Sequence, residues 1–189
     1  FGGSGKSATS GMIIKMLEDN NIQYKLFAPT GRAAKVLSDY TERPAATIHR
    51  GLGYMPPNWC YNEDAKLITD VVLVDEFSMT DIFLFKHLVE AIDFERTKLI
   101  LVGDSAQLPS VGPGNLLHDF IRSKKIPTVT LNKIFRYGEG GLMAVATDIR
   151  NMEEYLSKEA FQVFGNNQDY TFVNVSSDKM ILNVCLLYT

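Results

Sequence analysis

The sequence predicts an α/β protein with a doubly wound, mostly parallel sheet, because short apolar runs alternate with segments of helical periodicity. Two of these runs, residues 71–74 and 98–102, are continuously apolar or nearly so, which is typical of strands buried on both faces of a parallel sheet. Polar residues follow the ends of several runs. Since ligands bind at the carboxyl ends of strands in such sheets, we expect the functional site at this edge.

The individual elements follow from local patterns. We expect helices over residues 5–18, 32–38, 80–92 and 114–121, a helical turn at 47–50, and strands over 24–28, 71–74, 98–102 and 128–131. Residues 53–65 contain several Pro and Asn residues and are expected to be irregular, with Trp59 attaching this segment to the core.

The pattern changes after residue 131, where glycines interrupt the chain. Beyond them we expect helices at 142–151 and 179–187 and a strand at 170–175. We therefore interpret residues 1–131 as one domain and residues 132–189 as the incomplete beginning of a second domain.

Composition excludes several classes of protein. Hydrophobic residues make up 46% and charged residues 22% of the 189 residues, which is ordinary for a globular protein. No apolar run approaches the ~20 residues that span a membrane. Cys60 and Cys185 form no CxxC pair, and reduced thiols indicate a cytoplasmic protein. The net charge of −3 means that any contact with nucleic acid must be local.

The chain begins at Phe1 within a glycine-rich motif, so we expect that residues precede it.

The start of the chain predicts a phosphate site. Its residues match the end of the pattern GxxxxGK[ST]: Gly2, Gly3, Ser4, Gly5, Lys6 and Ser7. Backbone N–H groups of such a loop bind phosphate oxygens, Lys6 reaches the β- and γ-phosphates, and the Ser7 hydroxyl ligates magnesium. Alone, this short match equally describes a helix that begins after a flexible glycine segment.

Two acids strengthen the assignment. Asp75 and Glu76 directly follow the apolar run at 71–74. Asp75 is placed to hold magnesium, directly or through water, and Glu76 to orient and deprotonate the attacking water. The alternative is a strand end with two solvated acids. With the GKS loop upstream, we favour a P-loop NTPase that binds ATP and Mg²⁺.

A third polar group follows the run at 98–102. There Gln107 is a candidate to contact the γ-phosphate or the attacking water, or else it is an ordinary loop amide. Phosphoryl transfer also needs a cation near the γ-phosphate, and Arg136 is the candidate, although a lone arginine is usually a surface residue.

Taken together, the motifs resemble those of a known family. The matching segments are residues 28–34 (APTGRAA), 47–50 (TIHR), 74–79 (VDEFSM), 103–114 (GDSAQLPSVGPG) and 134–136 (IFR). In order and spacing they resemble the helicase motifs of the RecD/TraA-type branch of superfamily 1, which is exodeoxyribonuclease V alpha-subunit-like. The resemblance covers the chain from Gly2 to about Asn151.

The resemblance implies a RecA-like motor domain followed by the start of a second one. It implies an ATP-dependent DNA helicase that moves 5′ to 3′ on single-stranded DNA, with other subunits of a helicase–nuclease complex as further partners. It assigns Thr30, Arg32 and His49 to DNA contacts and Phe135 to nucleotide binding. From the residues alone, Thr30 would be a helix N-terminal residue and His49 a packed histidine.

Three departures from the family pattern stand out. Tyr137 replaces the usual Gln after Arg136, and Ser7 replaces the commoner Thr. The motifs that close the nucleotide site from the second domain are absent. Two other functions stay open: the helicase module of a conjugative relaxase, and a non-catalytic, nucleotide-dependent DNA-binding subunit.

Overall fold

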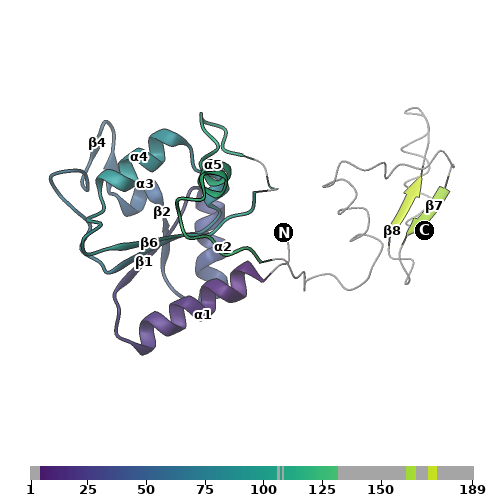
Figure 1. The fold of residues 1–189 in the computed structure, drawn as a ribbon, viewed down its shortest axis with the longest axis horizontal. Helices are drawn as coiled ribbons and strands as arrows, with labels where there is room; N and C mark the ends of the chain where they lie inside the picture. The colour runs from purple at the N-terminus through teal and green to yellow at the C-terminus, as the bar shows by residue number, and fades with distance from the viewer. Residues whose placement is uncertain (1–4, 106, 108, 132–160, 165–169, 174–189) are drawn as a thin grey trace. The chain divides into compact units, whose positions relative to one another are not determined.

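The computed structural model describes residues 5–105, 107, 109–131, 161–164 and 170–173, the last two ranges as backbone only. The chain divides into two units, Phe1–Ile134 and Phe135–Thr189, and each is described by itself. Figure 1 shows the element order along the chain.

The first unit contains a four-stranded parallel sheet. Its strands are β1 (Tyr24–Ala28), β2 (Ala45–Thr47), β5 (Val71–Val74) and β6 (Lys98–Leu101), in the order β2-β1-β5-β6. The central strand β5 pairs with β1 from Tyr24↔Val71 to Phe27↔Val74 and with β6 from Val71↔Lys98 to Val74↔Leu101. All four strands are parallel, so their carboxyl ends meet at one edge, and the predicted doubly wound α/β fold is confirmed.

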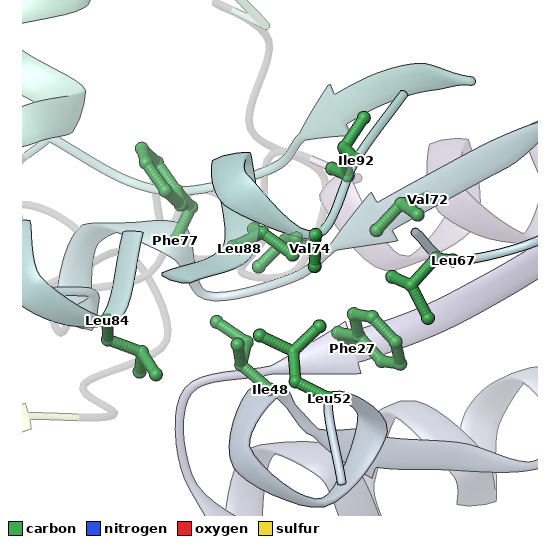
Figure 2. Packing of buried hydrophobic residues seen from close by; sticks show 11 residues of the cluster. Phe27, Ile48, Leu52, Leu67, Val72, Val74, Phe77, Leu84, Leu88 and Ile92 are labelled. Carbon is green, nitrogen blue, oxygen red and sulfur yellow. The ribbon is translucent and has the colours of Figure 1, made fainter. Parts of the chain in front are cut away.

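Successive side chains of the central strands pack into two cores on opposite faces, because side chains alternate along a strand. Leu26 and Leu73 pack against Ile14 of α1 (Lys6–Asp19) and Leu37 of α2 (Gly31–Thr41). On the other face, the cluster in Figure 2 joins the strands to α3 (Ile48–Gly51) and α4 (Ile82–Glu90). Its buried members are Phe27, Ile48, Leu52, Leu67, Val72, Val74, Phe77, Leu84, Leu88, Ala91 and Ile92. Helix α1 and helices α3 and α4 accordingly lie on opposite sides of β1 and β6 in Figure 1.

Side-chain caps explain where three of the helices begin. The Thr30 hydroxyl accepts a hydrogen bond from the Ala33 N–H at the start of α2, and Thr47 does the same for Arg50 in α3. Asp81 accepts from the N–H groups of Phe83 and Leu84, so it is the N-cap of α4. Such caps satisfy N–H groups that have no partner within the helix.

The segment expected to be irregular contains a small antiparallel hairpin of β3 (Tyr54–Met55) and β4 (Asn58–Trp59). The Trp59 ring stacks on His87 of α4, with ring centroids 4.4 Å apart, and on His49 of α3, at 5.4 Å. Trp59 also packs against the cluster of Figure 2, which confirms that it attaches this segment to the core.

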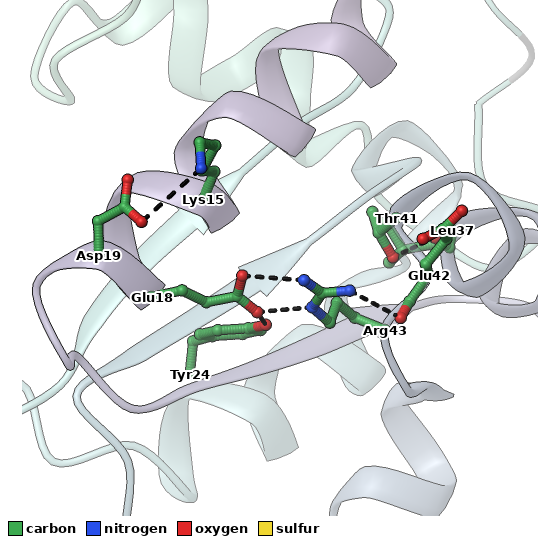
Figure 3. Close-up of polar contacts among 8 residues, drawn as sticks. All are labelled: Lys15, Glu18, Asp19, Tyr24, Leu37, Thr41, Glu42 and Arg43. Carbon is green, nitrogen blue, oxygen red and sulfur yellow. Dashed lines mark hydrogen bonds and ion pairs between the residues drawn. The ribbon is translucent and has the colours of Figure 1, made fainter.

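A polar network ties the end of α1 to the segment after α2 (Figure 3). Arg43 donates through Nε and Nη2 to the two carboxylate oxygens of Glu18, at 2.6 and 3.1 Å. The Tyr24 hydroxyl donates to the same carboxylate at 2.6 Å. These three hydrogen bonds to the charged form lower the pKa of Glu18 to about 2.

Two expectations were wrong. Residues 128–131 form no strand: they make no sheet pairing, and residues 128–130, Val129 among them, are exposed. β6 is not buried on both faces, because Lys98 is exposed and the other three residues are only partly buried. Among the residues described, β6 is an edge strand. The expectation failed because an apolar run in the sequence does not distinguish an edge strand from a central one.

Other boundaries shift by a few residues. A 3₁₀ helix, η1 (Phe77–Met79), precedes α4, and α5 (Leu116–Ser123) begins two residues later than expected. In the second unit, β7 (Phe161–Phe164) pairs antiparallel with β8 (Tyr170–Val173), which lies within the strand expected at 170–175. The helices expected at 142–151 and 179–187 lie outside the described residues.

Candidate active site

The candidate site lies where α1 begins, at the carboxyl-end edge of the sheet. Gly5 precedes α1 with φ 84°, a left-handed conformation that favours glycine, and no side chain among the described residues caps this helix. Lys6 and Ser7 therefore occupy the first turn of α1, where N–H groups and the helix dipole favour an anion. Gly2, Gly3 and Ser4 lie outside the described residues.

The ammonium of Lys6 is held by a buried acid. Its Nζ lies 3.0 Å from Oδ2 of Asp104, and the side chains are 17% and 3% exposed. Asp104 follows β6 in a loop that passes close to η1: a Cβ on Gly103 would lie 2.8 Å from the Leu117 side chain and 3.2 Å from the Ser78 nitrogen. The close approach that Gly103 permits brings Asp104 to Lys6.

Hydrogen bonds orient the carboxylate of Asp75, the first of the two acids after β5, and the backbone of Glu76 adopts an uncommon conformation. One oxygen of Asp75, Oδ1, accepts the N–H of Glu76 at 2.9 Å, and Oδ2 accepts the hydroxyl of Tyr40 at 3.0 Å. Glu76 has φ 51° and ψ 38°, which is uncommon for a residue with a side chain and is typical of functional sites. The bond to Asp75 stabilises this backbone conformation.

The Glu76 carboxyl is half-buried, and within the described residues its buried Oε2 has no hydrogen-bond partner. Burial raises the pKa of Glu76, and the charges of Asp75 and Asp104 raise it further, while Lys6 opposes them. A carboxylate whose pKa lies nearer neutrality is a better proton acceptor for catalysis.

Tyr40 is a member of the site that the sequence analysis missed. It comes from the last turn of α2, and burial together with the charge of Asp75 raises the pKa of its hydroxyl, which therefore stays protonated and remains a donor. No sequence pattern signals this contact, because the hydroxyl reaches Asp75 from a helix 35 residues upstream. Asp104 is a second member of the site to which the sequence analysis assigned no role. Its burial is the feature that would have identified it.

Other predicted residues are placed as follows. Gln107 is exposed, and its backbone N–H donates to the Asp104 carbonyl. Thr30 caps α2, and the His49 ring packs against Trp59 and Tyr54. Both residues therefore have a structural role in this unit. Arg32 is exposed in the first turn of α2. Phe135, Arg136 and Tyr137 lie outside the described residues.

The candidate metal ligands are oxygen atoms. Ser7 supplies a hydroxyl and Asp75 a carboxylate, which are the hard donors that Mg²⁺ prefers. The unpartnered oxygen of Glu76 is a further polar atom at this edge, suited to a water molecule. Within the described ranges, no group of three or more His, Cys, Asp or Glu side chains is arranged to hold a metal ion. Mg²⁺ commonly uses one or two protein oxygens plus phosphates and water, so the residues present fit this ion.

A parallel α/β sheet with a GKS turn at the start of one helix and an acid pair after the central strand defines a P-loop NTPase domain. Comparison with known proteins is more specific. Residues 1–172 match the AAA domain family, and the chain belongs to that family.

Individual relatives within reach of sequence comparison are named as RecD or RecD2 proteins. The chain is 36% identical over 134 residues to the ATP-dependent RecD2 DNA helicase of Deinococcus radiodurans, covering 71% of this chain and 18% of that protein. It is 32% identical over 175 residues to the RecBCD enzyme subunit RecD of Mycolicibacterium smegmatis, covering 78% of this chain and 31% of that protein. The resemblance to RecD-type helicases is thereby confirmed, and the chain spans less than a third of either relative.

The fold is also similar to a solved structure. The crystal structure of Bacteroides Pif1 bound to single-stranded DNA superposes with a TM-score of 0.53 at 22% identity, covering 80% of this chain and 41% of that one. The fold is therefore that of a RecA-like motor domain.

None of the helices in the described part of the chain has the length and apolar character needed to cross a membrane.

Proposed function

We propose that the protein is an ATP-dependent DNA helicase or translocase of the RecD/TraA type, which couples ATP hydrolysis to 5′-to-3′ movement on single-stranded DNA. The observation that carries the proposal is the convergence of Lys6, Asp104, Asp75 and Glu76 at one edge of the sheet, with an unpartnered Glu76 oxygen among them. Relatives named as DNA helicases support it.

Each residue has a proposed role in ATP hydrolysis. Lys6 binds the β- and γ-phosphates, and Asp104 holds its ammonium in place beforehand. Ser7 and Asp75 would hold magnesium, directly or through water, and the ion would supply positive charge to neutralise the phosphates. Glu76 orients the attacking water and accepts its proton. Gln107 and Arg136 sense the γ-phosphate, and Phe135 contributes to nucleotide binding.

The DNA contacts are proposed on the helices that follow β1 and β2. Thr30 and Arg32 stand at the start of α2, and His49 stands in α3. Thr30 keeps a hydroxyl hydrogen to donate to a phosphate, since its cap uses only the oxygen as acceptor. Arg32 supplies an exposed cation for the DNA backbone, and His49, which is also exposed, supplies a ring that can meet a base.

The wider organisation is also part of the proposal. Residues 1–131 form the first RecA-like domain, and residues 132–189 begin a second domain. Relatives named as RecBCD subunits support further protein partners in a helicase–nuclease complex. We place the protein in the cytoplasm.

Two other functions are testable alternatives. A conjugative relaxase would need a nuclease domain upstream with a histidine cluster and a catalytic tyrosine, which sequencing the gene would detect. A non-catalytic DNA-binding subunit would bind ATP without hydrolysing it. The Glu76 carboxyl argues against the second alternative, because its burial and raised pKa suit a base that acts on water.

The proposal predicts that Lys6→Ala weakens ATP binding, because Lys6 supplies the cation for the phosphates. In the intact protein, binding of a fluorescent ATP analogue should fall by at least about tenfold, since a hydrogen bond to a charged group contributes about 1.5–3 kcal/mol. Lys15→Ala is the matched control: Lys15 lies on the same helix, is 77% exposed and pairs only weakly with Asp19, at 3.8 Å. Normal binding by the Lys6 variant would refute the phosphate site.

A further inference from the structure

The Asp75 carboxylate is fixed by two donors from different parts of the chain. The Glu76 N–H, which donates to Oδ1, belongs to the next residue and cannot be removed by mutation. The Tyr40 hydroxyl, which donates to Oδ2 at 3.0 Å, comes from α2 and lies on a side chain. With both oxygens engaged, the carboxylate has one preferred orientation, and each oxygen keeps a lone pair for another partner.

The position of the Tyr40 hydroxyl is set by packing. The Tyr40 ring packs against the core cluster of Ile14, Leu26, Leu37 and Leu73, which joins α1 and α2 to the sheet. The ring is partly buried against this close-packed cluster, which limits its movement and keeps the hydroxyl near the end of β5. Tyr40 therefore connects the core under α2 directly to the acid after β5.

We propose that Tyr40 is a positioning residue that orients Asp75 for magnesium. The inference rests on the proposed function, which assigns Asp75 to the metal, and it adds a residue outside the phosphate loop and the acid pair. A hydrogen bond to a ligand carboxylate restricts its rotation, so that less orientational freedom is lost when the metal binds. Without the Tyr40 hydroxyl, Asp75 would turn about its side-chain bonds and bind the metal, or the metal's water, less well.

Tyr40→Phe tests this role, because phenylalanine keeps the packed ring and removes only the hydroxyl. In the intact protein, the magnesium concentration that half-saturates binding of a non-hydrolysable ATP analogue should rise by about tenfold. Analogue binding with the metal chelated should change by less than about twofold. Thermal melting of the variant verifies that it is folded.

Tyr24→Phe is the matched control. It removes a comparable tyrosine–carboxylate hydrogen bond, 2.6 Å long, from the Glu18–Arg43 network. This change should leave the half-saturating magnesium concentration unaltered. An equal rise in the Tyr24 and Tyr40 variants would overturn the proposal, because general loosening of the domain would then explain both.

A double-mutant cycle supplies the second test, because it asks whether Tyr40 acts through Asp75. If it does, Tyr40→Phe has little further effect on magnesium dependence in an Asp75→Asn background. An undiminished tenfold effect in that background overturns the proposal, as does unchanged magnesium dependence in Tyr40→Phe alone. If the wild-type protein binds the analogue equally well with and without magnesium, the proposed function fails as well. That failure is seen in the wild-type protein, whereas failure of the Tyr40 proposal alone is seen only in the variants.

Discussion

Two glutamates of this chain show how the surroundings of a carboxyl set its pKa. Glu18 accepts hydrogen bonds from Arg43 and Tyr24, which lower its pKa to about 2. Glu76 is half-buried beside Asp75 and Asp104, and its pKa is raised above the ordinary 4.5. The same side chain is thus a structural group that is charged at neutral pH at one site and a candidate base at the other.

Carboxyl titration by carbon NMR should resolve this difference. We predict one glutamate that titrates near pH 2, which disappears in Glu18→Gln, and one that titrates above 4.5, which disappears in Glu76→Gln. The direction follows from the causes: hydrogen bonds to the charged form lower a pKa, whereas burial and like charges raise it. A Glu76 carboxyl that titrates at or below 4.5 would remove the argument that its surroundings prepare it to accept a proton.

At this scale, local sequence patterns pointed to candidate residues of the site but not to the contacts between them. Lys6, Asp75 and Glu76 were predicted because each stands next to a loop or strand with a recognisable pattern. Tyr40 and the pairing of Asp104 with Lys6 were missed, because both contacts join residues far apart in the chain. Such contacts depend on how the elements pack, which local patterns do not encode.

At the scale of elements, the Glu18 network connects α1 to the segment that leads from α2 into β2 (Figure 3). Helix α1 carries Lys6, and helix α2 carries Tyr40. The network therefore helps to hold α1 and α2 in place relative to each other. It lies partly exposed, at 40% for Arg43 and 34% for Glu18, so solvent and salt weaken its contribution.

The network predicts a specific pH dependence of stability. Because the folded-state pKa of Glu18 is depressed, its contribution is complete above the unfolded value near 4.5 and is lost as the pH falls towards 2. Glu18→Gln should therefore lower the melting temperature at pH 7, and its difference from wild type should shrink between pH 4.5 and 2.

Asp19→Asn is the control for that measurement. Asp19 is 63% exposed and lies 3.8 Å from Lys15, so its loss should change stability little. Denaturation of both variants across this pH range, at low and at high salt, gives the comparison. A Glu18 effect that stays constant down to pH 2 would show that the hydrogen bonds seen here do not bias its ionisation.

Element types were largely predictable, and element surroundings were not. Residues 71–74 are buried on both faces, as their apolar run predicted. The similar run at 98–102 forms an edge strand within the described sheet, and the run at 128–131 forms no strand. Strand neighbours are decided by tertiary pairing, so similar runs can have different fates.

At the scale of the molecule, the site is an edge shared by elements from across the first unit. α1 contributes Lys6, α2 contributes Tyr40, and the loops after β5 and β6 contribute Asp75, Glu76 and Asp104. A change at this edge can therefore act on the two helices that cover one face of the sheet. Such a connection between site and helices suits the proposed function, in which ATP hydrolysis is coupled to movement.

In the proposed function, Glu76 activates water for ATP hydrolysis, and contact with single-stranded DNA stimulates this hydrolysis. The most direct measurement is steady-state ATP hydrolysis by the intact wild-type and Glu76→Gln proteins, with and without single-stranded DNA, alongside ATP binding. We predict that DNA stimulates the wild-type protein. The variant should bind ATP nearly as well but hydrolyse it at least about 100-fold more slowly. DNA-stimulated hydrolysis at the normal rate by Glu76→Gln would contradict the account.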